Sequence, residues 1–550
     1  MAIGEIIRNL RKRTQGKGPE KLEPYFPPTQ DVPIGLPKRV ESLCPECGKM
    51  IPATILEREG KVFMEKSCPE HGFIRDLVYS DARLYKTMQR WTYEDGEGIS
   101  NPQVTGAKVC PDDCWICDLH KSHEVLANVD LTNRCNLRCP ICFANANVKG
   151  YVYEPTYEQV VRMLKTLRNM KPVFPPAVQF SGGEPTIHPG FLDILKAARS
   201  LGFSHLQIAS NGIRIGKDLE FAKQAREAGL YTVYLQFDGI GDEVYQKTRG
   251  LAGLWALKLK AVENARIAGL RVVLVPTIIK TINDDQVGKI LQFAVDHAEV
   301  ISGISYQPVA FTGRISVEER ERQRYTLSDL AMDIGKQTGY LKALEDWYPL
   351  SISSTFSKLL SAIWKYDVMK ITAHADCGIG SYIFVNTETK NVIPITRIID
   401  IEGFTMDLNK LVKQKISSIR SLTAISAQHL LKKHFRPEEA QDGITPEICL
   451  ELFQGVVDKE SQKRIDRIYN RNMLLVGGMH FQDSYNYNVD RVKRCCIHYA
   501  APNGRLYPFC TYNSGPVFRE KIEREFSIPL DEWRQQNPKI EEADYFLCRA

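Results

Sequence analysis

Three cysteines stand close together in the stretch CNLRCPIC: Cys135, Cys139 and Cys142. Three thiolates on one short loop can bind three irons of a [4Fe-4S] cluster. The fourth iron then keeps an open position, which the amino group and carboxylate of a small molecule can fill. A zinc knuckle or a chance spacing is the alternative interpretation of these three residues taken alone.

Polar and small residues follow the strands that we expect after this motif. Residues 181–185 read SGGEP, in which glycines let the backbone approach a ligand closely and Glu184 can accept a hydrogen bond from an ammonium group. Polar side chains also end the next strands, in the order Ser210, Asn211, Gln236, Asp238 and Arg249. The first two are placed for a ribose, and the last is a candidate contact for a carboxylate.

In this order the motifs resemble those of the radical SAM superfamily, named for S-adenosylmethionine (SAM). The resemblance implies that an electron from the cluster enters the SAM sulfonium and releases a 5′-deoxyadenosyl radical. An aromatic residue usually precedes the third cysteine in this family, whereas Ile141 stands here; the backbone can still contact adenine. The resemblance implies these SAM contacts: Ile141, Phe143, Gly182, Gly183, Glu184, Ser210, Asn211, Gln236, Asp238, Arg249 and Gln307.

The elements that must position these residues alternate between strand and helix. We expect strands at 125–131, 177–181, 204–210, 231–237, 271–277 and 301–306. We expect helices between them at 156–170, 190–201, 216–229, 251–269 and 283–297. Six such repeats imply a parallel sheet but are too few for a closed eight-stranded barrel. The fold class is therefore α/β, with a partial (β/α)6 barrel over 124–315.

The chain has 15 cysteines, and none of them lies between residues 143 and 376. Such a distribution is not that of core filler. A disulfide framework requires an exported protein, and the sequence shows no export signal. We therefore expect metal binding, in a Cys-rich unit over 40–123 and again in a mainly helical C-terminal domain over 316–550, in which we expect a hairpin near 380–397.

Two knuckles near the N-terminus have the spacing of a mononuclear site. They consist of Cys44 with Cys47 and Cys68 with His71. Tetrahedral, sulfur-rich ligands suit zinc or a single iron. Cys110 or Cys117 in place of His71 would make all four ligands thiolates, and the sequence leaves both arrangements open.

The remaining cysteines are enough for two auxiliary [4Fe-4S] clusters. Cys110, Cys114 and Cys117 repeat the three-cysteine spacing, but before the first strand. A second SAM-cleaving cluster is disfavoured there because no second SGGEP-like set follows, and a zinc site using His120 or His123 is the other alternative. The candidate ligands of a second auxiliary cluster are Cys377, Cys495, Cys510 and Cys548, with Cys496 beside them.

Composition and hydropathy narrow the classes of protein to which this chain could belong. The net charge of +6 on 550 residues argues against a dedicated nucleic-acid binder. No run of 18 apolar residues and no signal peptide is present, so we expect a cytoplasmic protein. Residues 1–39 combine a basic amphipathic stretch, with Ile3, Ile6 and Leu10 at helical spacing, and a Pro-rich connector. The stretch suggests either a peripheral anchor on the membrane surface or a helix packed on the protein.

Over roughly residues 40–515 the motifs resemble the archaeal tetraether lipid synthases, including CPDDCWIC, QFSGGEPTIHP and RCCIHYAAPNGRLYPFC. This resemblance implies hydrogen abstraction from terminal methyls of isoprenoid chains of an archaeal phospholipid, followed by carbon–carbon coupling. It also implies a reductant protein such as ferredoxin. The same motifs resemble archaeal radical SAM methyltransferases that act on a pterin precursor of methanopterin. A lipid requires long apolar tunnels, whereas a pterin requires a small pocket with directed polar groups.

Overall fold

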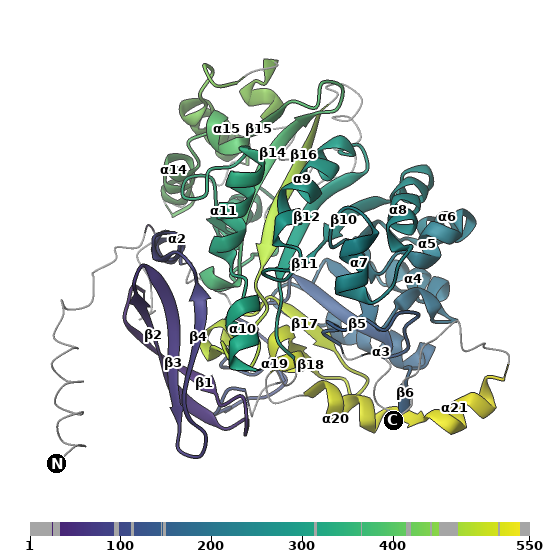
Figure 1. The fold of residues 1–550 in the computed structure, drawn as a ribbon. Coiled ribbons are helices and arrows are strands. Elements are labelled where there is room, and N and C mark those ends of the chain that lie inside the picture. Colours follow the sequence, from purple (N-terminus) through teal and green to yellow (C-terminus); the bar gives the residue numbers. More distant parts are fainter. Residues whose placement is uncertain are drawn as a thin grey trace, which may run out of the picture.

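The computed structural model describes residues 25, 34–92, 98–111, 115–144, 146, 150–312, 316–364, 366–413, 420–440, 443–449, 471–514 and 518–538 (Figure 1). The basic stretch at the N-terminus, Cys114 and Cys548 lie outside these residues. The expectations placed on them therefore stay predictions.

The N-terminal unit is an antiparallel sheet of four strands in chain order. Its strands are β1 (Lys38–Leu43), β2 (Met50–Arg58), β3 (Lys61–Cys68) and β4 (Gly72–Tyr79). Buried and accessible residues alternate along β3, as expected of a sheet with one face on a core. Helix α2 (Ala82–Arg90) follows and is capped by Asp81, whose side chain accepts from the backbone of Arg83. In Figure 1 this purple unit lies beside the central sheet.

The central sheet confirms the expected fold class. Its six expected strands are parallel neighbours: β5 (Leu126–Thr132), β7 (Ala177–Gly182), β8 (His205–Ser210), β9 (Thr232–Gln236), β10 (Arg271–Val275) and β12 (Ile301–Pro308). The helices between them are α3 (Tyr157–Arg168), α4 (Phe191–Ser200), α5 (Ile213–Lys217), α6 (Leu219–Ala228), α7 (Asp242–Arg249), α8 (Leu254–Ala268) and α9 (Val287–Asp296). The short β11 (Thr277–Ile278) pairs with β12.

Two strands from late in the chain extend this parallel sheet at both edges. β16 (Arg471–Met479) pairs in parallel with β12, and β17 (Ile497–Ala500) pairs in parallel with β5. Residues 480–496 connect them and therefore pass from one edge of the six-stranded sheet to the other. The β-α rhythm of the sequence does not reveal either edge strand, because no β-α repeat leads into them.

Outside β16, an antiparallel extension contains β13 (Tyr348–Pro349), β14 (Gly378–Asn386) and β15 (Val392–Pro394), which confirms the expected hairpin near 380–397. β18 (Leu506–Pro508) pairs with β17, and β6 (Tyr151–Tyr153) pairs with β19 (Ser527–Pro529). The C-terminal helices are α10 (Val317–Gln323), α11 (Leu327–Thr338), α12 (Ser353–Trp364), α13 (Ile395–Ile398), α14 (Ile401–Lys413), α15 (Arg420–His434), α18 (Val489–Lys493), α19 (Phe509–Ser514), α20 (Phe518–Glu525) and α21 (Leu530–Gln536).

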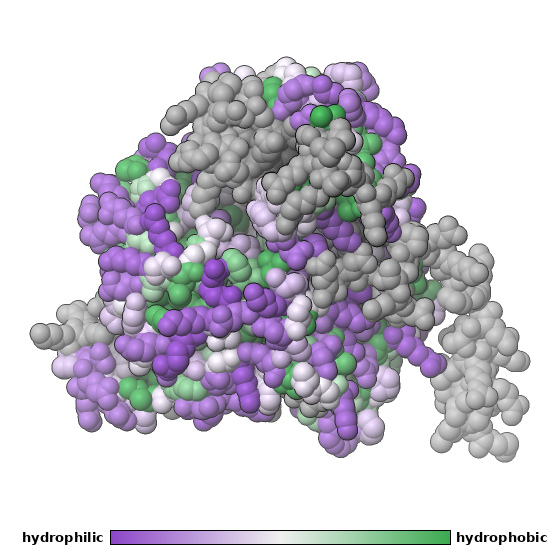
Figure 2. Space-filling model, turned by 180° about the vertical axis from the view of Figure 1, so that it is seen from behind, coloured by the Kyte–Doolittle hydropathy of each residue, from purple (hydrophilic) through white to green (hydrophobic). Residues whose placement is uncertain are grey.

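Within the described residues, no helix has both the length and the apolar character that crossing a bilayer requires. Figure 2 shows the face opposite to that of Figure 1. On its coloured part, hydrophobic residues lie in small groups between hydrophilic ones.

Candidate functional site

A cavity of about 330 Å³ lies within the parallel sheet and reaches the ends of its strands. It gathers most of the residues that the motifs single out: Cys135, Cys139, Ile141, Cys142, Phe143, Gly182, Gly183, Glu184, Ser210, Asn211, Gln236, Arg249 and Gln307. Asp238 is the exception, because it is fully buried behind the cavity wall. Residues spread over more than 170 positions of sequence thus share one site, as expected where parallel strands end together.

The three cysteines occupy the loop that follows β5. Burial raises the pKa of the Cys135 thiol well above its usual range, and the charges of Glu184, Cys142 and Cys139 raise it further. Burial also raises the pKa of Cys139, although the Arg249 guanidinium opposes this effect. Thiols that influence one another in this way lie close together. Because the charged forms of Cys135 and Cys139 are unfavourable without a metal, bound iron would relieve this cost.

The SGGEP loop is joined to the cysteine loop by backbone hydrogen bonds. The Gly183 amide donates to the Thr132 carbonyl at 2.7 Å, and the Glu184 amide donates to the Arg134 carbonyl at 2.9 Å. A Cβ atom at Gly183 would lie 2.1 Å from the Arg134 carbonyl oxygen, and one at Gly182 would lie 2.2 Å from that of Thr132. Only glycine permits this approach, so these two glycines fix the distance between the loops.

Glu184 holds the ends of two strands together. Its carboxylate accepts from the Thr186 hydroxyl at 2.6 Å, the Ser210 hydroxyl at 2.9 Å and the Asn211 amide at 2.8 Å. Burial raises the pKa of Glu184, although these donors oppose the shift. The carboxylate also lines the cavity, so an ammonium group placed there would find an acceptor that is already oriented.

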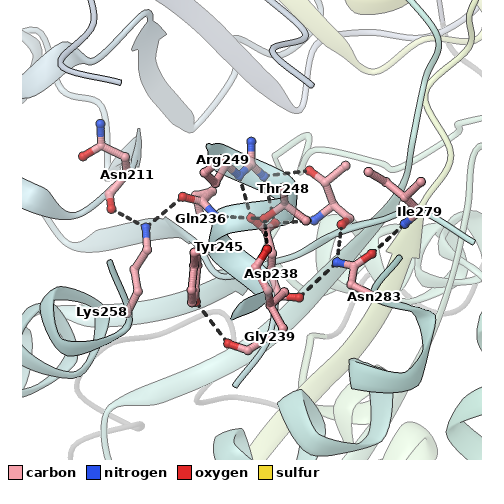
Figure 3. Close-up of polar contacts among 12 residues, drawn as sticks. Asn211, Gln236, Asp238, Gly239, Tyr245, Thr248, Arg249, Lys258, Ile279 and Asn283 are labelled. Carbon is pink, nitrogen blue, oxygen red and sulfur yellow. Dashed lines mark hydrogen bonds and ion pairs between the residues drawn. The ribbon is translucent and has the colours of Figure 1, made fainter. Parts of the chain in front are cut away.

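Asp238 is the centre of a network of polar contacts that holds Arg249 in place (Figure 3). Its carboxylate accepts from Arg249, with Nη2 to Oδ1 at 2.8 Å, from the Thr248 hydroxyl at 3.1 Å and from the Thr277 amide at 3.1 Å. Burial alone would lower the pKa of Arg249, but Asp238 and Cys139 outweigh it and raise that pKa. Asp238 therefore positions Arg249, and the guanidinium faces the cavity beside Cys139.

Lys258 reaches the same network from α8, in the core (Figure 3). Its Nζ donates to the Gln236 side-chain oxygen at 2.8 Å and to the Asn211 carbonyl. Burial lowers the pKa of Lys258 to about 7, because the charged ammonium is expensive to keep away from water. Lys258 thus holds two cavity residues in place, and the free-energy cost of burying its charged ammonium depends on pH.

This cost gives a measurable pH dependence. The pKa of Lys258 is lower in the folded chain than in the unfolded chain, so the unfolded state binds more protons between about pH 7 and 10. The free energy of unfolding should therefore rise with pH across this window. In Lys258→Met that rise should shrink by a few kcal/mol, on the order of 1.4 per unit of pKa shift. Denaturant unfolding at pH 6, 8 and 10, read as wild type minus variant, measures it. An unchanged difference across these pH values would contradict the assignment.

The interior of the sheet is polar, which the sequence analysis missed. Side chains of Asn128, Gln179, Ser181, Tyr234, Thr277 and Arg519 line the cavity below the strand ends. Arg519 comes from α20 and donates to Asp130, which also accepts from the Ser181 hydroxyl at 2.7 Å. The signal was present, because Asn128, Asp130 and Gln179 interrupt strands that otherwise read as apolar.

One wall of the cavity is aromatic. Phe143, directly after the third cysteine, lies nearly parallel to Phe509, with ring centroids 5.6 Å apart and planes at 14°. Phe509 in turn stacks on Phe481 at 4.1 Å, and Tyr499 lies 5.3 Å from Phe509. All four rings line the cavity. Phe481 belongs to the segment 480–496 between the edge strands, so this segment completes the site.

A second candidate site lies in the N-terminal sheet. Cys44, Cys47, Cys68 and His71 place one ligand atom each within 4.8 Å of one another, and this is the only such group of three or more ligands among the residues described. The Glu70 amide and the His71 ring lower the pKa of Cys68 to about 6, which favours a thiolate. The structure thus brings His71, rather than Cys110 or Cys117, to the knuckles, and the donor set fits zinc or iron.

Removing this metal should affect folding before chemistry. The double variant Cys44→Ser, Cys68→Ser should lose one metal ion per chain by elemental analysis. Its thermal midpoint should fall, because a structural metal contributes directly to folding. Cys449→Ala is the matched control, since Cys449 is fully buried in an apolar cluster with Leu359 and Phe384. Equal metal content in the double variant and the control would refute the site.

The other cysteines fall into two groups. Burial raises the pKa of the Cys495 thiol, and the charges of Cys510, Cys377 and Cys496 raise it further. Burial likewise raises the pKa of Cys496 to about 12, and this thiol lies beside Ser122 and Thr372. Cys110 and Cys117 are both buried, and burial and then the charge of Cys110 raise the pKa of Cys117. His120 lies 2.9 Å from the Cys495 carbonyl oxygen and 3.2 Å from His498.

Two family models match parts of this chain. The model of the radical SAM superfamily matches residues 129–294, and that of the HMPTM N-terminal zinc ribbon domain matches residues 36–80. A Methanocaldococcus jannaschii protein named 7,8-dihydro-6-hydroxymethylpterin dimethyltransferase is 41% identical over 508 residues, 91% of this chain and 97% of the relative. The GTP 3′,8-cyclase of Limosilactobacillus fermentum is 27% identical over 238 residues, 41% of this chain and 64% of that protein. The solved structure of Streptococcus suis SuiB bound to S-adenosylmethionine superposes with a TM-score of 0.31 at 16% identity, over 39% of this chain and 43% of that one.

Proposed function

Because this chain belongs to the radical SAM family that includes the Methanocaldococcus jannaschii relative, we propose that it is a methyltransferase acting on a 7,8-dihydropterin. The observation that carries the proposal is the cavity, which combines directed polar groups with an aromatic wall. Small heteroaromatic substrates are bound in such sites, where a few polar groups set orientation and flat apolar surfaces supply contact area.

The expected coupling of isoprenoid lipid chains is contradicted. The relative that covers 91% of this chain carries the name of a pterin dimethyltransferase. Of the two activities that the sequence motifs suggest, methylation of a pterin is therefore better supported than coupling of lipid chains. The error arose because both activities share the same cofactor motifs, which determine how a radical is made and not which substrate receives it.

The lining of the cavity gives a physical reason for this correction. An alkyl chain lying against Asn128 would keep water from its Nδ2 donor, which has no partner among the described residues, and would offer no acceptor in return. Each buried polar group left without a partner costs about 1–3 kcal/mol. A pterin ring offers carbonyl and ring-nitrogen acceptors to this donor, which would remove that cost.

The donor set of the main site fits a [4Fe-4S] cluster with SAM. Cys135, Cys139 and Cys142 would hold the iron, and the fourth iron would face the cavity. Once bound, the pair supplies a radical that removes a hydrogen atom from an unactivated C–H bond. Glu184 and Arg249 line the cavity, where Glu184 would accept from the amino group of SAM and Arg249 would place its positive charge beside the carboxylate.

We also propose auxiliary metals and an electron donor. Cys377, Cys495 and Cys510 lie close enough to affect one another, and the Arg491 guanidinium stands beside Cys377 and Cys510, where it would balance the charge of a thiolate-bound cluster. Cys110 and Cys117 supply two ligands of a further cluster. A reductant protein such as ferredoxin would deliver the electrons.

The experiment is an anaerobic incubation of the reconstituted enzyme with SAM, dithionite and 7,8-dihydro-6-hydroxymethylpterin. We expect 5′-deoxyadenosine together with a pterin whose mass has increased by one CH2 unit per methyl transferred. Deuterated SAM, labelled in its methyl group, shows whether that carbon comes from SAM. A parallel arm with an archaeal phospholipid should give no lipid product. Product in that arm and none from the pterin would overturn the proposal.

A further inference from the structure

Three side-chain amides form a ladder across neighbouring strands of the sheet, and two of them, Gln179 and Asn128, line the floor of the cavity. Gln207 on β8 donates from Nε2 to the side-chain oxygen of Gln179 on β7 at 2.7 Å. Gln179 donates in the same sense to the side-chain oxygen of Asn128 on β5 at 2.8 Å. The three residues are direct cross-strand partners, so their side chains share the inner face of the sheet.

The last amide of the ladder, Asn128, keeps a donor that has no partner among the described residues. Gln179 accepts from Gln207 and donates to Asn128, so the Asn128 oxygen is occupied and its Nδ2 is left over. Asn128 is fully buried, its Nδ2 atom has no hydrogen-bond partner within the part of the chain that the structure describes, and the residue lines the cavity. A buried N–H without an acceptor is costly, and such groups in folded proteins usually meet a ligand or water.

The surroundings of this donor point to a flat ligand. Tyr499 on β17 is the direct cross-strand partner of Asn128 on the other side. Its ring continues the aromatic wall through Phe509 to Phe143 and Phe481. A planar ring lying against this wall would present its edge, rather than its face, to the floor of the cavity.

We infer that Asn128 Nδ2 donates to an acceptor atom on the edge of a planar heteroaromatic substrate and thereby fixes the orientation of its ring. The identity of the ring, a dihydropterin, rests on the proposed function. The ladder explains how orientation is enforced. Because the Asn128 oxygen accepts from Gln179, the amide cannot turn over without losing that bond. Asn128 therefore presents a hydrogen-bond donor to the ligand and disfavours a ligand atom that is itself a donor.

The test is direct binding without turnover. Reconstituted enzyme with SAM but no reductant is titrated with 7,8-dihydro-6-hydroxymethylpterin, and Kd is read from pterin fluorescence. Asn128→Asp keeps the acceptor for Gln179 and removes the donor. It should weaken binding about 10- to 100-fold, the loss expected when a buried polar group of the ligand is left unpaired. Asn128→Leu should weaken it similarly.

Asn472→Asp is the matched control. Asn472 is a buried amide on β16 that donates to the Ala298 carbonyl at 2.7 Å and does not line the cavity. Its Kd should equal that of the wild type. Thermal melts of all variants separate a binding defect from unfolding.

The two claims can fail separately. Tight pterin binding that is equal in the wild type and both Asn128 variants would overturn the role of Asn128 and leave the proposed function standing. No pterin binding by the wild type would overturn the proposed function. Guanosine, whose ring also carries a carbonyl acceptor, then tests the role of Asn128 as a donor independently of the pterin. If guanosine binds and Asn128→Asp weakens its binding, this role is supported. If the wild type binds neither guanosine nor the pterin, this role is rejected.

Discussion

The triple variant Cys135→Ala, Cys139→Ala, Cys142→Ala should form no 5′-deoxyadenosine at all. These thiols are the only protein ligands that can hold a cluster in the cavity shared by Glu184 and Arg249, within the residues that the structure describes. SAM can be reduced only where it binds an open iron, so the expected loss is complete rather than partial. Iron content should fall by about four atoms per chain, because one [4Fe-4S] cluster is missing.

The variant should keep the rest of its metal. The cysteines around Arg491 and those of the N-terminal sheet lie on other elements, so their signals in iron and zinc analysis should remain. Cys449→Ala serves as the control, with full iron content and full SAM cleavage, because this cysteine lies in an apolar cluster. Normal 5′-deoxyadenosine formation by the triple variant would falsify the assignment of this site.

Asp238→Ala should damage both stability and SAM binding. The Asp238 carboxylate is fully buried and Arg249 nearly so, with exposed side-chain fractions of 0% and 8%. Removal of one partner leaves a buried guanidinium without its counter-charge, which costs about 3–5 kcal/mol. Arg249 would also lose its fixed orientation beside Cys139. We expect a free energy of unfolding lower by that amount and SAM affinity reduced at least about tenfold.

Asp193→Ala is the comparison for this effect. Asp193 pairs with Lys196 on the surface of α4, where both side chains are largely exposed. Such pairs contribute about 0–1 kcal/mol, so the control should unfold like the wild type. Chemical denaturation and equilibrium dialysis with SAM measure the two properties. If Asp238→Ala matched the control in both, Asp238 would have no part in positioning Arg249.

Local features of the sequence determined the chemistry of the main site. The spacing of Cys135, Cys139 and Cys142 allows one loop to supply three ligands. The polar residues that follow each strand had to meet, because parallel strands end at the same edge of a sheet. The alternation of strand and helix likewise determined the central fold, with boundaries within a few residues. These conclusions depend on short stretches whose geometry is set by neighbours in the chain.

The rest was decided by contacts between distant segments. β16 and β17 are close in sequence but lie at opposite edges of the six parallel strands, and no local sequence pattern predicts this arrangement. Arg519 meets Asp130 across 389 positions of sequence, and the ladder from Gln207 to Asn128 exists only when three strands are in register. Such contacts depend on how whole elements pack, so the residue types alone do not predict them.

For the cysteines and the substrate, too, the sequence determined one part and the tertiary structure decided the other. The sequence could count the thiols outside the main motif, but only the tertiary structure shows which of them affect one another. The charges of Cys510, Cys377 and Cys496 all raise the pKa of Cys495, and Cys496 also lies beside Ser122. The cofactor motifs are short stretches of sequence, and they indicate how a radical is made. On the proposed function, the substrate would be selected by a cavity wall that is assembled from strands, a crossing segment and a C-terminal helix. The physical reason is that ligand spacing is a property of one loop, whereas the shape and polarity of a cavity are properties of the packed chain.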